Sequence, residues 1–278
     1  MSTCRFAATP IALSAFWLVC LGPARGLADY PTEAQDVAFL ARCDGTTQHY
    51  AMLLPEDFDP SSPHCLFVAL HGHGSDRWQY IRDGRDECRV ARDVAATWRM
   101  VFVSPDYRAR TSWMGPKAEA DLVQLLGDLT RKFRIDKTVL AGGSMGGSSA
   151  LSFAALHPDL VDGVVAMNGT ANHLEYENFQ DAIRASFGGT KLEIPEEYKK
   201  RSAEYWPERL DMPVGLTAGG RDQSVPPGSV LRLADVLKKI GRPVLVVHRK
   251  EGGHSTNYDD GKRVLEFVIR NATGRQAP

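Results

Sequence analysis

Residues 138–147 read TVLAGGSMGG, and this stretch decides the fold. Residues 138–141 form a short apolar run that predicts a buried strand, and residues 148–156 predict a helix. Between them lies the pattern Gly-x-Ser-x-Gly around Ser144. In such a strand-turn-helix the serine occupies a strained turn, and the flanking glycines are needed because a side chain there would collide with neighbouring backbone. The stretch therefore predicts an exposed hydroxyl at a helix N-terminus, where the helix dipole favours developing negative charge.

A glycine-rich stretch of this kind can also be a flexible linker or a phosphate-binding loop. A linker would not lie between a buried strand and an apolar helix. A phosphate-binding loop needs a lysine after its last glycine, where this chain has Ser148. The context therefore favours a nucleophile at Ser144.

The rest of the chain alternates between strand and helix patterns. Residues 35–42 and 48–54 flank a turn and predict an antiparallel hairpin. Short apolar runs, which are typical of a parallel sheet buried on both faces, then lie at residues 66–70, 100–103, 138–141, 163–167, 214–217 and 244–247. Residues 118–133, 230–240 and 264–268 have helical spacing. We expect an α/β fold with a mostly parallel central sheet, helices on both faces and the N-terminal antiparallel hairpin.

The sequence predicts a short leader followed by one domain that contains an insertion. Residues 1–28 have the order of a secretory signal peptide, with one early positive charge at Arg5, an apolar run at 11–21 and small residues before Asp29. The run is shorter than the roughly 20 residues that cross a bilayer, so we expect a secreted or periplasmic protein without a stable membrane span. We expect residues 29–278 to form one catalytic domain, with the strand-free interval 168–210 as an insertion that forms a small lid or a pocket wall.

The composition narrows the range of partners and ligands. The chain has 278 residues, a formal net charge of -1 and 43% hydrophobic residues, which excludes disorder, collagen and coiled coil. Its balanced charges give no electrostatic footprint for nucleic acid. Cys43, Cys65 and Cys88 follow the signal peptide, and three thiols cannot all pair within one chain. The sequence leaves open whether two of them form a disulfide while the third is a buried free thiol. No Cys-x-x-Cys or His-x-x-x-His spacing predicts a metal site.

A serine hydroxyl needs a general base and an acid that orients the base. His254 follows the last predicted strand, in a loop at the carboxyl edge of the sheet. Asp222 follows the strand before it, although it can also be a simple turn residue ahead of two prolines. The chain order Ser144, Asp222, His254 is the order expected of an α/β-hydrolase.

The remaining parts of the site are an oxyanion hole and a substrate pocket. The backbone N–H of Met145 directly follows the serine, and the backbone N–H of His73 lies in the glycine-rich loop after the third strand. We expect these two groups to bind the oxyanion. For substrate binding we suggest four residues, although such residues can equally be packing groups: Trp113, Met114, Tyr176 and Trp206.

These motifs resemble the α/β-hydrolase superfamily over nearly all of residues 29–278. Within it, the His-Gly-His-Gly loop at 71–74, the Gly-Gly-Ser-Met-Gly-Gly elbow and Gly-Gly-Arg-Asp at 219–222 look like the secreted esterases grouped with polyhydroxybutyrate depolymerases, feruloyl and acetylxylan esterases, and prolyl oligopeptidase-type catalytic domains. The resemblance implies a Ser-His-Asp hydrolase that needs no metal or organic cofactor. It also implies a small-molecule or carbohydrate-linked ester as substrate.

We therefore expect a serine hydrolase that cleaves carboxylic esters through an acyl-enzyme. A serine peptidase of the prolyl oligopeptidase type is the alternative, which is less expected because no propeller domain precedes the hydrolase domain in this sequence. A catalytically inactive secreted binding protein on the same fold is a second alternative, and an acyltransferase or lyase is a third. The sequence leaves the oligomeric state open.

Overall fold

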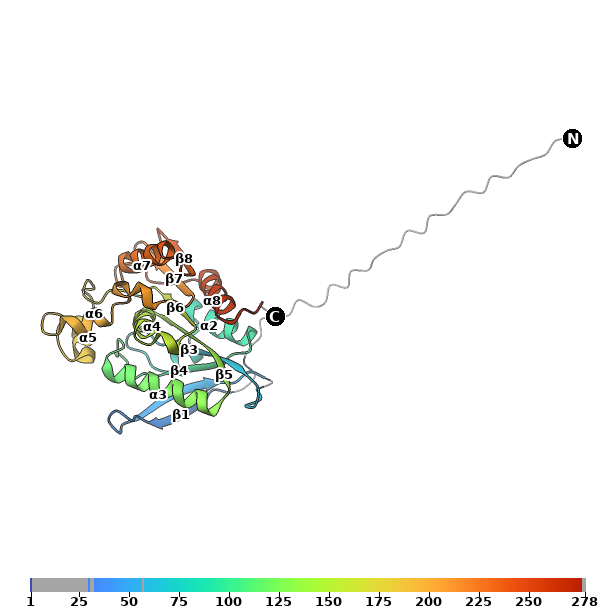
Figure 1. Ribbon diagram of the computed structural model, residues 1–278, viewed down its shortest axis with the longest axis horizontal. Coiled ribbons are helices and arrows are strands. Elements are labelled where there is room, and N and C mark those ends of the chain that lie inside the picture. The colour runs from blue at the N-terminus through green and yellow to red at the C-terminus, as the bar shows by residue number, and fades with distance from the viewer. Residues whose placement is uncertain (2–29, 31–32, 57, 277–278) are drawn as a thin grey trace.

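A computed structural model describes residues 1, 30, 33–56 and 58–276. Apart from Met1, the predicted signal peptide at residues 1–28 lies outside the described residues. The strands of the described part form one eight-stranded sheet (Figure 1). They are β1 (Gln35–Leu40), β2 (Thr47–Leu53), β3 (His64–Leu70), β4 (Val101–Pro105), β5 (Ile135–Gly143), β6 (Gly163–Met167), β7 (Val214–Gly219) and β8 (Val244–Arg249).

The sheet has the order β1-β2-β4-β3-β5-β6-β7-β8. The hairpin β1–β2 is antiparallel, and β2 is antiparallel to β4, whereas every pair from β4 to β8 is parallel. The predicted fold is thus confirmed. Because β3 to β8 run in the same direction, the loops that follow their carboxyl ends gather at one edge of the sheet, which is where ligands bind in such folds.

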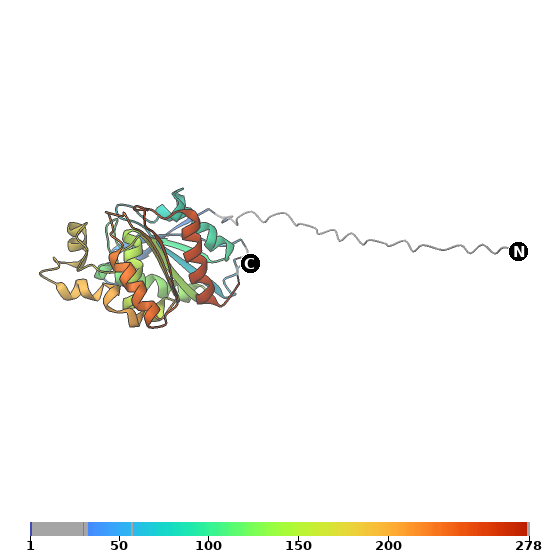
Figure 2. The ribbon, with the colours of Figure 1, turned by 90° about the horizontal axis from the view of Figure 1, so that it is seen from above.

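Helices cover both faces of the sheet. They are α1 (Gln79–Arg82), α2 (Asp86–Thr97), α3 (Pro116–Lys132), α4 (Met145–Leu156), α5 (Gln180–Phe187), α6 (Pro195–Lys200), α7 (Gly228–Lys239) and α8 (Tyr258–Thr273). Figure 2 shows α2 and α8 together on one side of the sheet, and these two helices contact each other extensively. The helix predicted at 148–156 begins three residues earlier than expected, because Met145, Gly146 and Gly147 already belong to it.

Side chains of successive strand residues pack into two hydrophobic clusters, one on each face. In β5, Leu140 joins the cluster that contains the apolar residues of α3, α4 and α7. Val139 and Ala141 join the other cluster, together with those of α2 and α8. This alternation follows from the period of two along a strand, and it makes β5 a rigid support that is buried on both sides.

The interval 168–210, every residue of which the structure describes, contains α5, α6 and two short 3-10 turns but no strand. Figures 1 and 2 show α5 and α6 together beyond one end of the sheet.

In the described part of the chain, no helix combines the length and the apolar character needed to span a bilayer.

The described cysteines are all free thiols. No disulfide joins the cysteines that the structure describes: Cys43 is exposed, whereas Cys65 and Cys88 are buried. Burial raises the pKa of the Cys88 thiol to about 12. The two buried thiols therefore pack as small apolar groups.

Candidate active site

Ser144 occupies the sharp turn between β5 and α4. Its backbone has φ 57° and ψ −121°, a conformation that costs an L residue about 1–3 kcal/mol. The turn is held by a 2.8 Å hydrogen bond from the Ser144 N–H to the carbonyl of Met167 on β6. A Cβ on Gly146 would collide with the carbonyl oxygen of Leu70, and a Cβ on Gly142 would collide with the backbone of Gly146. The glycines of the motif thus allow the close packing that the turn requires.

The imidazole of His254 bridges Ser144 and Asp222. Its Nε2 lies 2.9 Å from Ser144 Oγ, and its Nδ1 lies 2.6 Å from Asp222 Oδ2. An ionised carboxylate only accepts hydrogen bonds, so Nδ1 carries the proton and the lone pair of Nε2 faces the serine hydroxyl. This arrangement allows the imidazole to accept the hydroxyl proton when the oxygen attacks an electrophile. The structure therefore brings together the three residues predicted to form a triad.

Asp222 is buried and firmly oriented. Its Oδ1 accepts hydrogen bonds of 2.9 Å from the N–H groups of both Ser224 and Val225, which leaves Oδ2 for His254. The neighbouring glycines let this loop approach the loop of the histidine. A Cβ on Gly220 would collide with the carbonyl oxygen of Lys250. The acid and the base are thus held by direct backbone contact between the loops after β7 and β8.

The glycine-rich loop after β3 is fixed from two sides. The buried hydroxyl of Tyr107 donates a 2.6 Å hydrogen bond to the carbonyl of His71. The N–H of Gly72 donates a 2.7 Å hydrogen bond to Oε1 of Gln79. Gly74 has φ 83°, which favours glycine at this position. These contacts hold the loop beside the turn of Ser144.

The two N–H groups predicted to bind an oxyanion have no partner among the residues that the structure describes. Within the described residues, neither the backbone N–H of His73 nor that of Met145 donates a hydrogen bond. Met145 is the first residue of α4, where the N–H groups lack intrahelical partners. Both donors are therefore available to a ligand oxygen.

The side chain of His73 has a defined protonation state. The indole Nε1–H of Trp113 donates a 3.1 Å hydrogen bond to Nδ1 of His73, so the ring proton of the neutral histidine lies on Nε2. Partial burial lowers the pKa of His73 and thus favours this neutral form. The ring of Phe179 packs on His73 with the ring centroids 4.5 Å apart.

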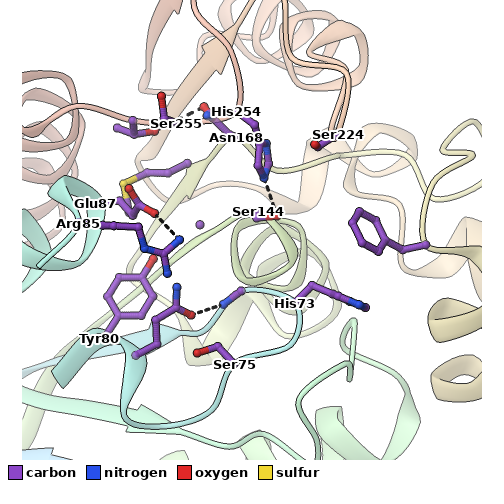
Figure 3. Close-up of a pocket in the computed structure, with 16 residues that line it drawn as sticks. His73, Ser75, Tyr80, Arg85, Glu87, Ser144, Asn168, Ser224, His254 and Ser255 are labelled. Carbon is purple, nitrogen blue, oxygen red and sulfur yellow. Dashed lines mark hydrogen bonds and ion pairs between the residues drawn. The ribbon is translucent and has the colours of Figure 1, made fainter. Parts of the chain in front are cut away.

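A cavity of about 310 Å³ opens beside Ser144 and His254. Figure 3 shows its two sides, with His73 on one side of Ser144 and Tyr80, Arg85 and Glu87 on the other. The aromatic ring of Phe179 lines the cavity as well. One side thus carries the rings of His73 and Phe179, whereas the other carries the charged side chains of Arg85 and Glu87.

The predicted pocket residues need a correction, because Trp113, Met114, Tyr176 and Trp206 do not line this cavity. Trp113 and Met114 have φ of 43° and 58°, and both side chains are fully buried, with the indole of Trp113 hydrogen-bonded to His73. The hydroxyl of Tyr176 is occupied by the carbonyl of Ser224, to which it donates at 2.7 Å. Trp206 is fixed elsewhere by a 3.0 Å hydrogen bond to the carbonyl of Lys199.

Sequence reasoning missed other residues that line the cavity beside Ser144, His254 and His73. Phe179 belongs to the aromatic-rich interval 168–210, but its role depends on a left-handed backbone with φ 55° at the start of α5. Tyr80 lies in α1, Arg85 is the residue before α2 and Glu87 lies in the first turn of α2; no sequence motif marks them. Within the described residues, no three His, Cys, Asp or Glu side chains lie close enough together to hold a metal ion.

Sequence comparison identifies the family of the chain. A model of the prolyl oligopeptidase family matches residues 114–273, which is more than half of the chain and includes Ser144, Asp222 and His254. A search among curated proteins gave no match.

Solved structures share the fold. Puromycin hydrolase superposes with a TM-score of 0.70 at 20% identity, covering 88% of this chain and 40% of that one. The acylaminoacyl peptidase of Pyrococcus horikoshii gives 0.67 at 17% identity, covering 88% of this chain and 43% of that one. A ferulic acid esterase gives 0.65 at 16% identity, covering 86% of this chain and 98% of that one. The chain thus spans less than half the length of the first two proteins.

Proposed function

The chain belongs to the prolyl oligopeptidase family of serine hydrolases, and we propose that it cleaves carboxylic esters with Ser144 as nucleophile, His254 as general base and Asp222 as the orienting acid. The observation that carries this proposal is the continuous hydrogen-bond chain from Ser144 Oγ through the His254 imidazole to Asp222 Oδ2, with distances of 2.9 and 2.6 Å.

The proposed reaction has two steps. In the first, Ser144 Oγ attacks the ester carbonyl carbon while Nε2 of His254 takes the hydroxyl proton. The carbonyl oxygen becomes an oxyanion, which the N–H groups of His73 and Met145 stabilise, each by about 3 kcal/mol. The bond to the alcohol oxygen then breaks, and His254 gives the proton to that oxygen. The product is an alcohol and an acyl group on Ser144.

In the second step, water replaces the alcohol. His254 takes one proton from the water as its oxygen attacks the acyl carbon, and the proton returns to Ser144 Oγ when the acid leaves. Asp222 stabilises the imidazolium in both steps and keeps the imidazole in the required tautomer. The enzyme thus ends each cycle in its starting protonation state.

The family and the superposed structures include peptidases, so a peptide amide is the second candidate substrate. The ferulic acid esterase supports the ester assignment, because nearly its whole chain corresponds to this one, whereas less than half of the acylaminoacyl peptidase does. The cavity volume of about 310 Å³ also suits a small ester.

A substrate panel tests the proposal. We would assay the wild type and Ser144→Ala with p-nitrophenyl acyl esters, methyl ferulate and a peptide amide, and verify by circular dichroism that both proteins are folded. Ester turnover that the alanine abolishes is the expected result. Turnover of the amide alone would favour the peptidase, and ligand binding without any turnover would favour a binding protein.

A further inference from the structure

The loop that carries His254 is held on both sides of the histidine. On the side that precedes it, Lys250 lies so close to the loop of Asp222 that a Cβ on Gly220 would collide with its carbonyl oxygen. On the side that follows it, the loop is held by the buried side chain of Thr256. The hydrogen bond between Asp222 and His254 explains the first contact, whereas the proposed chemistry assigns no role to a buried hydroxyl on the second side.

Thr256 belongs to a cluster of three buried polar side chains, together with Asn168 and Thr217. Oγ1 of Thr256 lies 2.6 Å from Oγ1 of Thr217 and 3.4 Å from Oδ1 of Asn168. The hydroxyl of Thr217 donates to Oδ1 of Asn168 at 3.2 Å. Because each hydroxyl has only one proton to donate, Thr256 donates to Thr217 over the shorter contact. The hydrogen bonds thus run from Thr256 through Thr217 to Asn168, where they end on the amide oxygen.

Asn168 also lies beside the nucleophile. It directly follows Met167, the last residue of β6, whose carbonyl accepts the hydrogen bond from the N–H of Ser144. Figure 3 shows Asn168 next to His254 at the cavity, which both residues line. The cluster therefore joins the strand that holds the turn of Ser144 to the loop that holds His254.

Two features of Asn168 are unfavourable for a residue that only fills space. Its φ of 50° is left-handed, a conformation that asparagine adopts more readily than most residues. Its Nδ2 is buried and has no hydrogen-bond partner among the described residues, and buried donors are rarely left unpaired. Unfavourable local conformations that the surrounding structure maintains are concentrated at functional sites. These features indicate a role for the amide oxygen, the acceptor on which the cluster ends.

We propose that Asn168, Thr217 and Thr256 are positioning residues, which hold the imidazole of His254 at the distance from Ser144 that proton transfer requires. The transfer needs Nε2 of His254 within hydrogen-bond reach of Ser144 Oγ, and the two atoms are 2.9 Å apart. Without the hydroxyl of Thr256, the loop loses its anchor on the side that follows His254. This inference rests on the proposed roles of Ser144 and His254, and it applies to an ester and to an amide substrate alike.

Two substitutions of Thr256 separate hydrogen bonding from packing. Thr256→Val keeps the shape and removes the hydroxyl, so kcat should fall by about ten-fold with KM unchanged. Thr256→Ser keeps the hydroxyl and removes the methyl group, so at least about half of the wild-type kcat should remain. Asn168→Gly removes the acceptor while the φ of 50° stays accessible, and it should lower kcat at least as much as Thr256→Val. A kcat that falls in Thr256→Ser but not in Thr256→Val would show a packing role and overturn the proposal.

Thr97→Val is the matched control. The hydroxyl of Thr97 donates a 2.7 Å hydrogen bond to the carbonyl of Asp93 within α2, and Thr97 does not line the cavity. We expect its kcat to stay within about two-fold of wild type, measured at a temperature at which every variant is folded. An equal loss of kcat in Thr97→Val and Thr256→Val would contradict a specific effect on His254.

A double-mutant cycle tests whether the cluster acts through His254. The rate at which a fluorophosphonate labels Ser144 is a suitable measure, because it requires no particular substrate. Thr256→Val should lower this rate about ten-fold when His254 is present, but by less than about two-fold in a His254→Gln background, where the base is already absent. An equal fall in both backgrounds would refute the positioning of His254.

Proton NMR provides a test that does not depend on activity. The proton between Nδ1 of His254 and Asp222 should give a signal far downfield, which is identified by its absence in His254→Gln. Thr256→Val should shift or broaden this signal, and Thr256→Ser should leave it in place. If Ser144 does not react but the signal responds in this way, the positioning role is supported and the proposed function fails. If Ser144 reacts and the signal is unchanged in Thr256→Val, the positioning role is refuted.

Discussion

Gly219 and Gly253 touch backbone to backbone, so closely that a Cβ on Gly219 would collide with the carbonyl oxygen of Gly253. The contact joins the loop of Asp222 to the loop of His254. Two hydrogen bonds of 2.8 Å reinforce it, one from the Gly220 N–H to the carbonyl of Arg249 and one from the Arg221 N–H to the carbonyl of Gly252. The distance between the proposed acid and base is therefore set by the backbone.

Gly219→Ala should separate the two loops. Because a displacement of about 1 Å can cost about 100-fold in rate, we expect kcat to fall by at least about ten-fold, with a loss of about 1–3 kcal/mol in the free energy of unfolding from overpacking. Steady-state kinetics and urea unfolding measure both effects. Gly127→Ala in α3 is the control, because its Cβ would meet only the flexible end of Arg131. An unchanged kcat in Gly219→Ala would show that the contact has no role in positioning.

Asp222→Asn should lower kcat by about 10⁴-fold while the protein stays folded. The asparagine Oδ1 can still accept from the N–H groups of Ser224 and Val225. Its amide group, however, would donate toward Nδ1 of His254 and so favour the tautomer that cannot accept the serine proton. Asp235→Asn, at an exposed position of α7, should leave kcat unchanged. A loss smaller than ten-fold in Asp222→Asn would argue against an orienting acid at this position.

Glu119 should make stability depend on pH. Burial alone would raise the pKa of Glu119, but the hydrogen bond from His157 and the charge of the buried Arg201 bring it from 4.5 to about 2. A carboxyl whose pKa is lower in the folded than in the unfolded state contributes its full stabilisation at pH values above the unfolded pKa. That contribution, about 2–3 kcal/mol, is lost as the pH falls from about 4.5 toward 2.

Urea unfolding across this pH range checks the expectation. Glu119→Gln should be less stable than wild type at pH 7, and the difference should shrink as the pH approaches 2. A difference that stays constant over the range would show that Glu119 does not titrate with a lowered pKa. The ion pair connects α3 to the end of α6, so the variant also tests how the interval 168–210 is anchored.

Local patterns and topology explain how much of the fold could be predicted. The apolar runs of β5, β6 and β7 are buried on both faces, and this condition leaves a strong signal in the sequence. The loops that follow parallel strands all lie at the carboxyl edge of the sheet. Ser144, Asp222 and His254 could therefore be expected to meet at that edge although they lie far apart along the chain.

The pocket could not be predicted, because it depends on backbone conformations that no pattern encodes. The sequence predicts that Trp113 contacts the substrate, yet its left-handed backbone accompanies a fully buried indole that donates to Nδ1 of His73. Phe179 lies on the surface of the cavity for a similar reason. Arg85 and Glu87 reach the cavity because α2 begins beside it, and the position of α2 follows from its packing against α8 and β4.

The activation of Ser144 by His254 is measured most directly by covalent labelling with a fluorophosphonate, followed by mass spectrometry of the peptide that contains residue 144. We expect one adduct, on Ser144, in the wild type and none in Ser144→Ala, with a labelling rate at least about 100-fold lower in a folded His254→Gln variant. Labelling at another residue, or labelling of Ser144 at the wild-type rate in His254→Gln, would contradict this expectation.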